Sequence, residues 1–142
     1  MNPHLETALS FARHFKHDPK LPAILTAMIV SGGRVLSVGF NRRTPSGNGL
    51  QEYYKTNPFC NSIHAEVDAV LSARKKIDLR GSKMYIVRRQ RGDCAENPKI
   101  VLAKPCEMCQ AVLFSYGIKR ATYTVSNNEY GILKITDPRL SE

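Results

Sequence analysis

Apolar residues follow a helical spacing at the start of the chain and a strand-like pattern directly after it. Asn2 can cap a helix that Pro3 begins, and Asp18-Pro19 ends the pattern, so a helix is predicted near residues 3–17. Its apolar positions are Leu5, Ala8, Leu9, Ala12 and Phe15. Two apolar runs, 23–30 and 35–40, flank a glycine-containing turn and predict a β-hairpin.

The second half of the chain alternates between the two patterns. A helix that begins at Asn61 or Ser62 is predicted to end in the basic residues 74–76, and a strand is predicted at 84–87, before a polar stretch. The apolar run 99–103 is either the returning strand of a hairpin or the lead into the next helix. Pro105 and Gly117 are typical of the two ends of that helix. Strands are predicted at 121–125 and 132–135, on either side of a turn-rich stretch.

This order of elements predicts an α/β fold with a mixed sheet flanked by helices. A connection of helical length between the third and fourth strands favours a parallel pair there, whereas short turns favour antiparallel pairs at both ends of the order. The last two strands are therefore expected to run antiparallel. The chain shows no repeat or linker, and 142 residues are expected to form one domain, 1–142.

Residues 44–62 have no sustained period and combine Gly, Pro and Asn with aromatic residues. A loop of this length in a compact domain is often a lid or a binding loop. Its aromatic residues Tyr53, Tyr54 and Phe59 could stack on a nucleobase or pin the loop to the core.

Composition excludes the collagen-like and disordered classes, because 42% of the residues are hydrophobic and 23% are charged. The formal net charge of +9 is concentrated in residues 74–91, where eight Lys or Arg stand against the single acid Asp78, a net of +7. Such a basic block favours anionic partners, either nucleotide phosphate or a polynucleotide. Its other interpretation is a solvated face that keeps the protein soluble.

No stretch reaches the roughly 18 continuous apolar residues that a membrane span requires. Residues 1–15 mix charged and apolar side chains, unlike a secretory leader. A cytoplasmic, reducing location without membrane contact is therefore expected, where cysteines are metal ligands, nucleophiles or buried thiols. Cys60 and Cys94 have no well-spaced partner set and are expected to be buried or incidental thiols.

Two short motifs, each at the start of a predicted helix, carry the candidate chemistry. Cys106 and Cys109 lie one helical turn apart, so their thiolates can bind one metal ion together with His64. Three protein ligands leave zinc one position for water, which is the mark of a catalytic site. Two thiolates and a neutral imidazole balance the ion's charge formally, so a nearby base is needed to take up the proton of that water. Glu66, two residues past His64, is placed to do so.

The combination of His-x-Glu with Pro-Cys-x-x-Cys is the signature of zinc-dependent nucleobase deaminases. In this chain the motifs read His64-Ala65-Glu66 and Pro105-Cys106-Glu107-Met108-Cys109. Over roughly residues 21–135 the chain resembles the cytidine and deoxycytidylate deaminase superfamily. The resemblance implies a three-layer fold with a mixed five-stranded sheet, a zinc cofactor on His64, Cys106 and Cys109, and Glu66 as the catalytic proton shuttle. The implied reaction is hydrolytic: zinc-activated water attacks the amino-bearing ring carbon, and ammonia leaves.

The resemblance also implies a substrate contact. Gly39-Phe40-Asn41 is similar to a Gly-x-Asn motif of the family whose asparagine contacts the substrate, so Asn41 is expected to do so here. Ala65, between the two motif residues, is expected to bind substrate as well. Lys104 stands where several purine and tRNA deaminases that resemble this chain carry Glu, which weakens a purine assignment.

Two groups of arginines are candidates for a phosphate contact. Arg42 and Arg43 directly follow Asn41 and are expected to lie nearer the substrate. Arg88, Arg89 and Arg91 follow the third strand and are the rival group. Alternation along a strand would direct Arg88 and Arg89 to opposite faces, so both are not expected to serve one phosphate.

Together these features predict hydrolytic deamination of cytosine in a free nucleoside or nucleotide, of the cytidine, deoxycytidine or dCMP type. The antiparallel last pair supports this, because it resembles free-nucleoside deaminases more than polynucleotide editors. The first alternative is the same chemistry on single-stranded DNA or a tRNA loop. The second is a non-catalytic nucleic-acid-binding module that keeps zinc for folding, which Glu66 argues against. Relatives of this architecture are commonly oligomers, so a homo-oligomer in nucleotide metabolism is expected.

Overall fold

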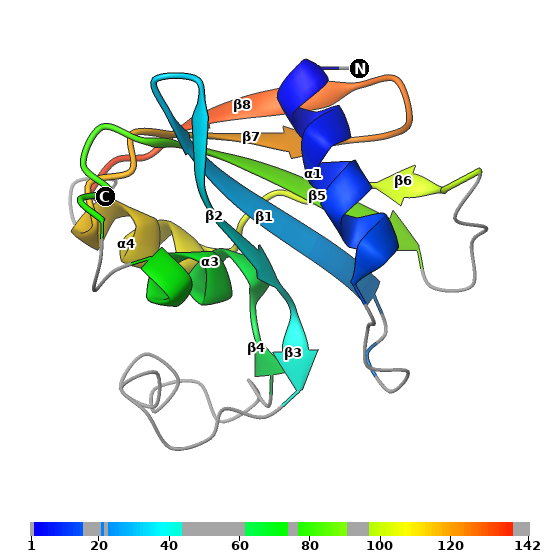
Figure 1. Cartoon of the computed structure of the whole chain (residues 1–142), viewed down its shortest axis with the longest axis horizontal. Helices are drawn as coiled ribbons and strands as arrows, with labels where there is room; N and C mark the ends of the chain where they lie inside the picture. Colours follow the sequence, from blue (N-terminus) through cyan, green and yellow to red (C-terminus); the bar gives the residue numbers. More distant parts are fainter. Residues whose placement is uncertain are drawn as a thin grey trace.

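A mixed sheet lies between helices in the computed structural model, with α1 on one face and α3 and α4 on the other (Figure 1). The structure describes residues 2–15, 21, 23–43, 62–73, 77–90 and 97–137. Its helices are α1 (Pro3–His14), α3 (Ala65–Ala73) and α4 (Glu107–Ser115). Its strands are β1 (Ala23–Ser31), β2 (Arg34–Phe40), β3 (Arg42–Arg43), β4 (Ser62–Ile63), β5 (Lys83–Gln90), β6 (Ile100–Val101), β7 (Arg120–Thr124) and β8 (Tyr130–Lys134). The α/β, three-layer class predicted from the sequence is confirmed.

The main sheet has the strand order β2-β1-β5-β7-β8, and β6 pairs with β5 beside this path. The pairs β1–β2, β1–β5 and β7–β8 are antiparallel, whereas β5 and β7 are parallel. The predicted parallel pair and the predicted antiparallel last pair are therefore both confirmed. Because β6 runs antiparallel to β5, the apolar run 99–103 contains the returning strand of a hairpin.

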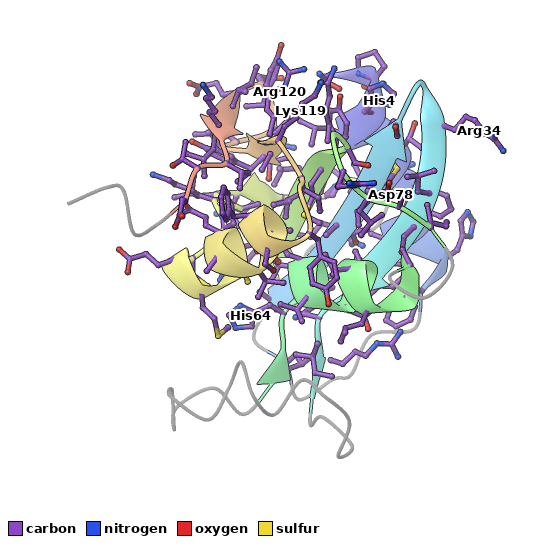
Figure 2. All side chains as sticks on the ribbon, turned by 90° about the vertical axis from the view of Figure 1, so that its left-hand side faces the viewer. His4, Arg34, His64, Asp78, Lys119 and Arg120 are labelled. Atoms are coloured by element: carbon purple, nitrogen blue, oxygen red, sulfur yellow. The ribbon has the colours of Figure 1, made fainter. Side chains whose placement is uncertain are left out.

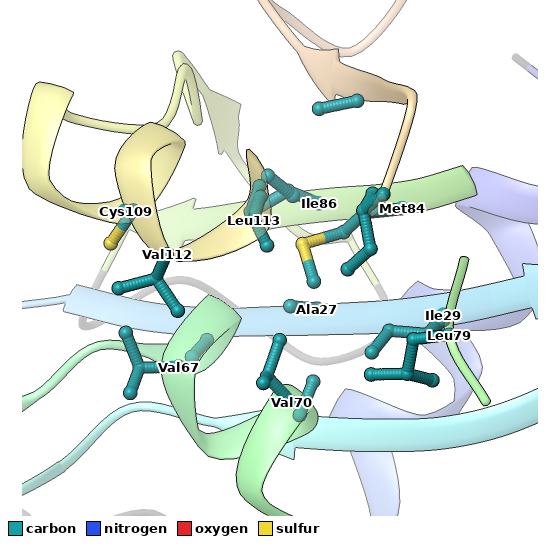
Figure 3. Packing of buried hydrophobic residues seen from close by; sticks show 14 of the residues in the cluster. Ala27, Ile29, Val67, Val70, Leu79, Met84, Ile86, Cys109, Val112 and Leu113 are labelled. Carbon is teal, nitrogen blue, oxygen red and sulfur yellow. The ribbon is translucent and has the colours of Figure 1, made fainter. Parts of the chain in front are cut away.

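Alternation along β1 divides the core into two halves. Ala27 and Ile29 face α3 and α4, where they join the larger apolar cluster drawn in Figure 3. Met28 and Val30 face α1 and pack with its residues Leu5, Ala8 and Leu9. Both faces of this internal strand are thus buried, which holds the three layers together. Among the described residues, no helix combines the length and the apolar character that crossing a membrane would need.

The start of α1 and the first hairpin turn follow the sequence prediction. Asn2 Oδ1 accepts hydrogen bonds from the backbone N–H groups of His4 at 2.8 Å and Leu5 at 3.4 Å, and so caps the helix. Gly32 and Gly33 have φ values of 56° and 76°, the left-handed backbone that a tight β1–β2 turn requires. The helix ends at His14, three residues before the predicted end.

Three predicted boundaries are wrong, each because of backbone pairing or capping. The second helix does not begin at Asn61 or Ser62, since Ser62–Ile63 pair as strand β4 with β3 and α3 starts at Ala65. Strand β5 continues past the predicted 84–87 to Gln90, because β1 and β6 pair with its polar end on both sides. Pro105 is not the first residue of α4, which starts at Glu107.

Several sequence predictions lie outside the described residues. These are the predicted loop over residues 44–61 with Tyr53, Tyr54, Phe59 and Cys60, the basic residues 74–76, and Arg91 and Cys94.

Gly39 allows the closest approach between the sheet and α3. A Cβ atom at this position would overlap the Ala69 backbone N and the Ala65 carbonyl O, and would lie 2.7 Å from Ala69 Cα. Because all three atoms belong to helix backbone, they cannot move aside as a flexible side chain would. The glycine therefore sets the spacing between β2 and the helix that carries the His-x-Glu motif.

Gly39→Ala is expected to force β2 and α3 apart and to destabilise the protein by about 1–3 kcal/mol, the usual cost of overpacking. Urea unfolding of the zinc-loaded protein measures this loss. Val35→Ala on the same strand is the control, because Val35 is exposed and should change stability by no more than ~0.5 kcal/mol. Equal stability of Gly39→Ala and the parent chain would contradict the proposed close packing.

Candidate active site

The N-terminal ends of α3 and α4 bring one imidazole and two sulfurs together. His64 directly precedes α3, Cys106 is the N-cap residue of α4, and Cys109 lies in the first turn of that helix. His64 Nδ1 is 3.2 Å from Cys109 Sγ and 3.6 Å from Cys106 Sγ. His64 and Cys106 are 42 positions apart in the sequence, and the two motifs thus meet at one point on the face of the sheet that α3 and α4 cover.

These three side chains fit a zinc ion. Their candidate ligand atoms all lie within 4.8 Å of one another. Bond lengths of about 2.3 Å to sulfur and 2.0–2.1 Å to nitrogen, at tetrahedral angles, place ligand nitrogen and sulfur roughly 3.6 Å apart. The observed separation of 3.6 Å from Cys106 Sγ equals that value, and the 3.2 Å from Cys109 Sγ is slightly shorter. Two thiolates and an imidazole are also a donor set that zinc favours over magnesium or calcium.

Glu66 is the fourth member of this cluster. Its side chain is 4% exposed, and its Oε1 has no hydrogen-bond partner in the described part of the chain. A buried carboxylate oxygen without a partner is expensive unless the site supplies one when it is loaded. Glu66 also lines the same pocket as His64 and Cys106. The predicted proton shuttle is therefore positioned beside the three metal-ligand candidates.

The environment shifts the pKa values of all four groups. Hydrogen bonds from Cys109 and His64 lower the pKa of the Cys106 thiol to about 4, against the opposing effect of its partial burial. The adjacent Cys106 sulfur raises the pKa of His64 and, together with burial, that of Cys109. Burial raises the pKa of Glu66. A thiolate ready to bind a cation and a carboxylate that can hold a proton thus lie side by side.

A pocket of about 270 Å³ opens onto this cluster, just below the usual range of small-molecule sites, roughly 300–1,000 Å³. Its apolar wall comes from the start of β1 and from Leu21 before it, and the metal-ligand candidates His64 and Cys106 also line it. The lining residues are Leu21, Ala23, Leu25, Asn41, His64, Ala65, Glu66, Arg88, Lys104 and Cys106. Two substrate residues expected from the sequence, Asn41 and Ala65, are therefore at the pocket.

Asn41 is tied to the apolar wall of the pocket. Its Oδ1 accepts a hydrogen bond from the Leu25 N–H at 2.9 Å, and its Nδ2 donates to the Ala23 carbonyl at 2.7 Å. Its backbone N–H also donates to the Leu25 carbonyl at 3.3 Å. The side-chain amide keeps one further N–H donor, which these bonds do not use. Asn41 thus fixes the pocket wall and retains one polar group for a ligand.

The structure does not bring Arg42 into this pocket. Arg42 Nε donates to Asp68 Oδ1 at 3.0 Å, and its guanidinium carbon lies 5.6 Å from the centre of the Phe15 ring. Asp68 also accepts from the Phe40 N–H at 3.0 Å, so the pair joins the end of β2 to α3. The side chain of Arg43 is outside the described residues.

The rival arginines diverge as alternation along a strand predicts. Arg88 is exposed and lines the pocket, whereas Arg89 is buried, with 6% of its surface exposed. The sequence interpretation did not identify Lys104 as a pocket residue, although its place directly before the Pro-Cys motif was a signal. It also missed Asp68, for which an acid two residues after Glu66 was the available signal.

Comparison with known proteins agrees with this geometry. Residues 2–125 match the family described as the cytidine and deoxycytidylate deaminase zinc-binding region. No curated protein sequence matches the chain significantly.

Solved deaminase structures share the fold. The cytidine deaminase from Burkholderia pseudomallei is 18% identical, covers 95% of this chain and 94% of its own, and superposes with a TM-score of 0.63. The dCMP deaminase from the cyanophage S-TIM5, solved in complex with dCMP and dUMP, is 22% identical with a TM-score of 0.55. That match covers 87% of this chain and 82% of the phage enzyme. Given the family match over most of its length and the His64, Cys106 and Cys109 cluster, the chain belongs to the cytidine and deoxycytidylate deaminase family of zinc-dependent aminohydrolases.

Proposed function

We propose that residues 1–142 form one catalytic domain that hydrolyses cytosine in a free nucleoside or nucleotide to uracil and ammonia. The observation that carries this proposal is the shared pocket: a buried carboxylate oxygen of Glu66, with no hydrogen-bond partner among the described residues, lies next to the His64, Cys106 and Cys109 cluster. A site that only stabilised the fold would have no use for that carboxylate.

Each group of pocket residues has its own role in the proposed reaction. His64, Cys106 and Cys109 would hold zinc, which when bound acts as a Lewis acid that promotes ionisation of water. Glu66 takes up one proton of the attacking water and delivers it to the ring nitrogen. It then takes the second proton from the hydroxyl group that has been added to the ring carbon, as the carbonyl forms, and passes it to the departing amine. Water therefore supplies the new oxygen of uracil, and ammonia carries away the amino nitrogen. Asn41 offers its remaining N–H to the substrate, and Ala65 lines the pocket beside it.

Two cations at the pocket support a phosphorylated substrate. Arg88 and Lys104 are both exposed side chains that line it, and Glu66 is the one acid among the described lining residues. A phosphate on the ribose or deoxyribose would meet both positive groups, and the forked guanidinium of Arg88 suits two of its oxygens. The phage dCMP deaminase in complex with dCMP and dUMP makes monophosphates the first compounds to test.

The described part of the basic block supports a free nucleotide over a polynucleotide. Arg80 is paired with Asp78 at 2.8 Å, and Arg89 is buried. Lys83 and Arg88 lie five residues apart on β5, a separation of roughly 17 Å along an extended strand. The described residues of the block, within 77–90, therefore do not form one continuous track that leads into the pocket.

Ammonia release and a uracil product are expected with CMP or dCMP, and more weakly with cytidine or deoxycytidine. Glu66→Gln should lower turnover by about 10²–10⁴-fold, the usual contribution of a positioned acid–base group, while it keeps fold and zinc content. Assays on this panel, with a cytosine-containing oligonucleotide included, measure both effects. Deamination only within the oligonucleotide, with steep salt dependence, would favour the polynucleotide alternative. Full activity of Glu66→Gln would contradict the assigned shuttle.

Cys109→Ala is expected to lose stoichiometric zinc and to unfold at a lower temperature, because two remaining ligands bind the ion far more weakly. Metal analysis after dialysis and thermal melting measure these two changes. Cys94→Ala, which removes a cysteine outside the motifs, is the matched control and should keep its zinc. Full zinc occupancy in Cys109→Ala would show that the ligand assignment is wrong.

Arg88→Ala is expected to raise KM for the monophosphate roughly tenfold or more, since a charge-assisted contact is lost, with little change for the nucleoside. Lys104→Ala should act in the same direction. Arg34→Ala, at the far hairpin turn, is the charge-matched control. If the variants change nucleoside and nucleotide kinetics equally, the two cations do not recognise phosphate.

A further inference from the structure

A second concentration of positive charge lies at the end of the sheet away from the pocket. Lys83 pairs with Arg120 across β5 and β7, and Arg120 pairs with Lys134 across β7 and β8. Directly paired residues project from the same face of a sheet, on strands about 4.8 Å apart. Three cations thus form one row across three adjacent strands, which we call the cationic row.

This row is unfavourable for folding by itself. Like charges directly opposite each other destabilise neighbouring strands, and Lys83 and Arg120 are also partly buried, which removes some of their water. The ion pairs among the described residues join Arg42 to Asp68 and Arg80 to Asp78, and neither includes a member of the row. Within the described ranges, then, no carboxylate balances these charges, whereas a bound anion would.

The surface at the row is hollowed. Lys119 joins Lys83, Arg120 and Lys134 in lining a cavity of about 420 Å³. A second cavity of about 160 Å³ shares Lys83 and Lys119, and its wall includes His4 and Tyr85, whose rings lie 4.6 Å apart. Figure 2 shows His4, Lys119 and Arg120 close to one end of the molecule and His64 at the other. The two cavities therefore form a site separate from the catalytic pocket.

We propose that this site binds a short chain of phosphates, such as a di- or triphosphate group. Four cations from three strand ends converge on one local cavity, and their combined charge matches a compact multivalent anion. The guanidinium of Arg120, with Lys83 and Lys134 on either side, can contact two phosphate oxygens at once. A nucleic acid strand would need a longer line of cations than this row. Arg88 in the catalytic pocket does not extend the row, because it lies toward the other end of β5 from Lys83.

Calorimetric titration of the zinc-loaded full chain with inorganic tripolyphosphate tests this site. The expected result is saturable binding with one site per chain that raises Tm. Lys134→Gln and Arg120→Gln should each weaken the affinity roughly tenfold, because each removes one charge-assisted contact. Lys134 is exposed at the end of its strand, so its replacement leaves the core intact. Arg13→Gln, which removes an exposed cation in the last turn of α1 that lines neither cavity, should bind as the parent chain does.

Titrations with a nucleoside triphosphate and with oligonucleotides show whether the phosphate chain belongs to a free nucleotide or to a nucleic acid. A nucleoside triphosphate that binds more tightly than tripolyphosphate, and loses that advantage in Tyr85→Leu, would extend the site into the smaller cavity. Absence of saturable binding, or equal weakening by Arg13→Gln, would overturn the proposal. Oligonucleotides that bind more tightly with increasing length, while tripolyphosphate does not bind, would overturn it in favour of a nucleic acid surface.

Discussion

The contact of His64 Nδ1 with Cys109 Sγ at 3.2 Å is the constraint on which the rest of the site depends. It requires that α3 and α4 present their N-terminal ends to the same point, and both helices pack on one face of the sheet to do so. Cys109 belongs at once to the apolar cluster and to the metal-ligand set. Binding of zinc and packing of the core are therefore linked, since neither helix can shift without separating the ligands.

The catalytic motifs could be predicted because their spacing is local. Cys106 and Cys109 are one helical turn apart, and His64 and Glu66 are joined by a single residue, so each pair keeps its geometry in any fold that forms the helices. The parallel β5–β7 pair followed similarly from connection length. The hydrophobic pattern did not predict the polar end of β5. This segment is a strand because β1 and β6 pair with it on either side.

Contacts that depend on how the strands and helices are placed in space could not be predicted from the sequence. Asp68 in the first turn of α3 binds Arg42 of β3 because the end of β2, directly before β3, lies against that turn. This contact joins residues 26 positions apart. Lys104 and Arg88 reach one pocket from different parts of the chain. The basic block, residues 74–91, is continuous in the sequence. In the fold, however, Lys83 and Arg88 lie toward opposite ends of β5. Positive charge at the far end of the sheet instead combines Lys83 with residues from β7 and β8.

We propose that two sulfurs and one nitrogen of this chain hold a zinc ion that keeps an exchangeable water next to Glu66. Zinc-edge X-ray absorption spectroscopy of the purified protein tests it most directly, because it identifies the atoms bound to the metal. The expected spectrum contains two sulfur, one nitrogen and one oxygen neighbour, and the oxygen is replaced when a competing anion such as cyanide is added. A spectrum with four protein ligands and no response to the added anion would contradict a catalytic metal site.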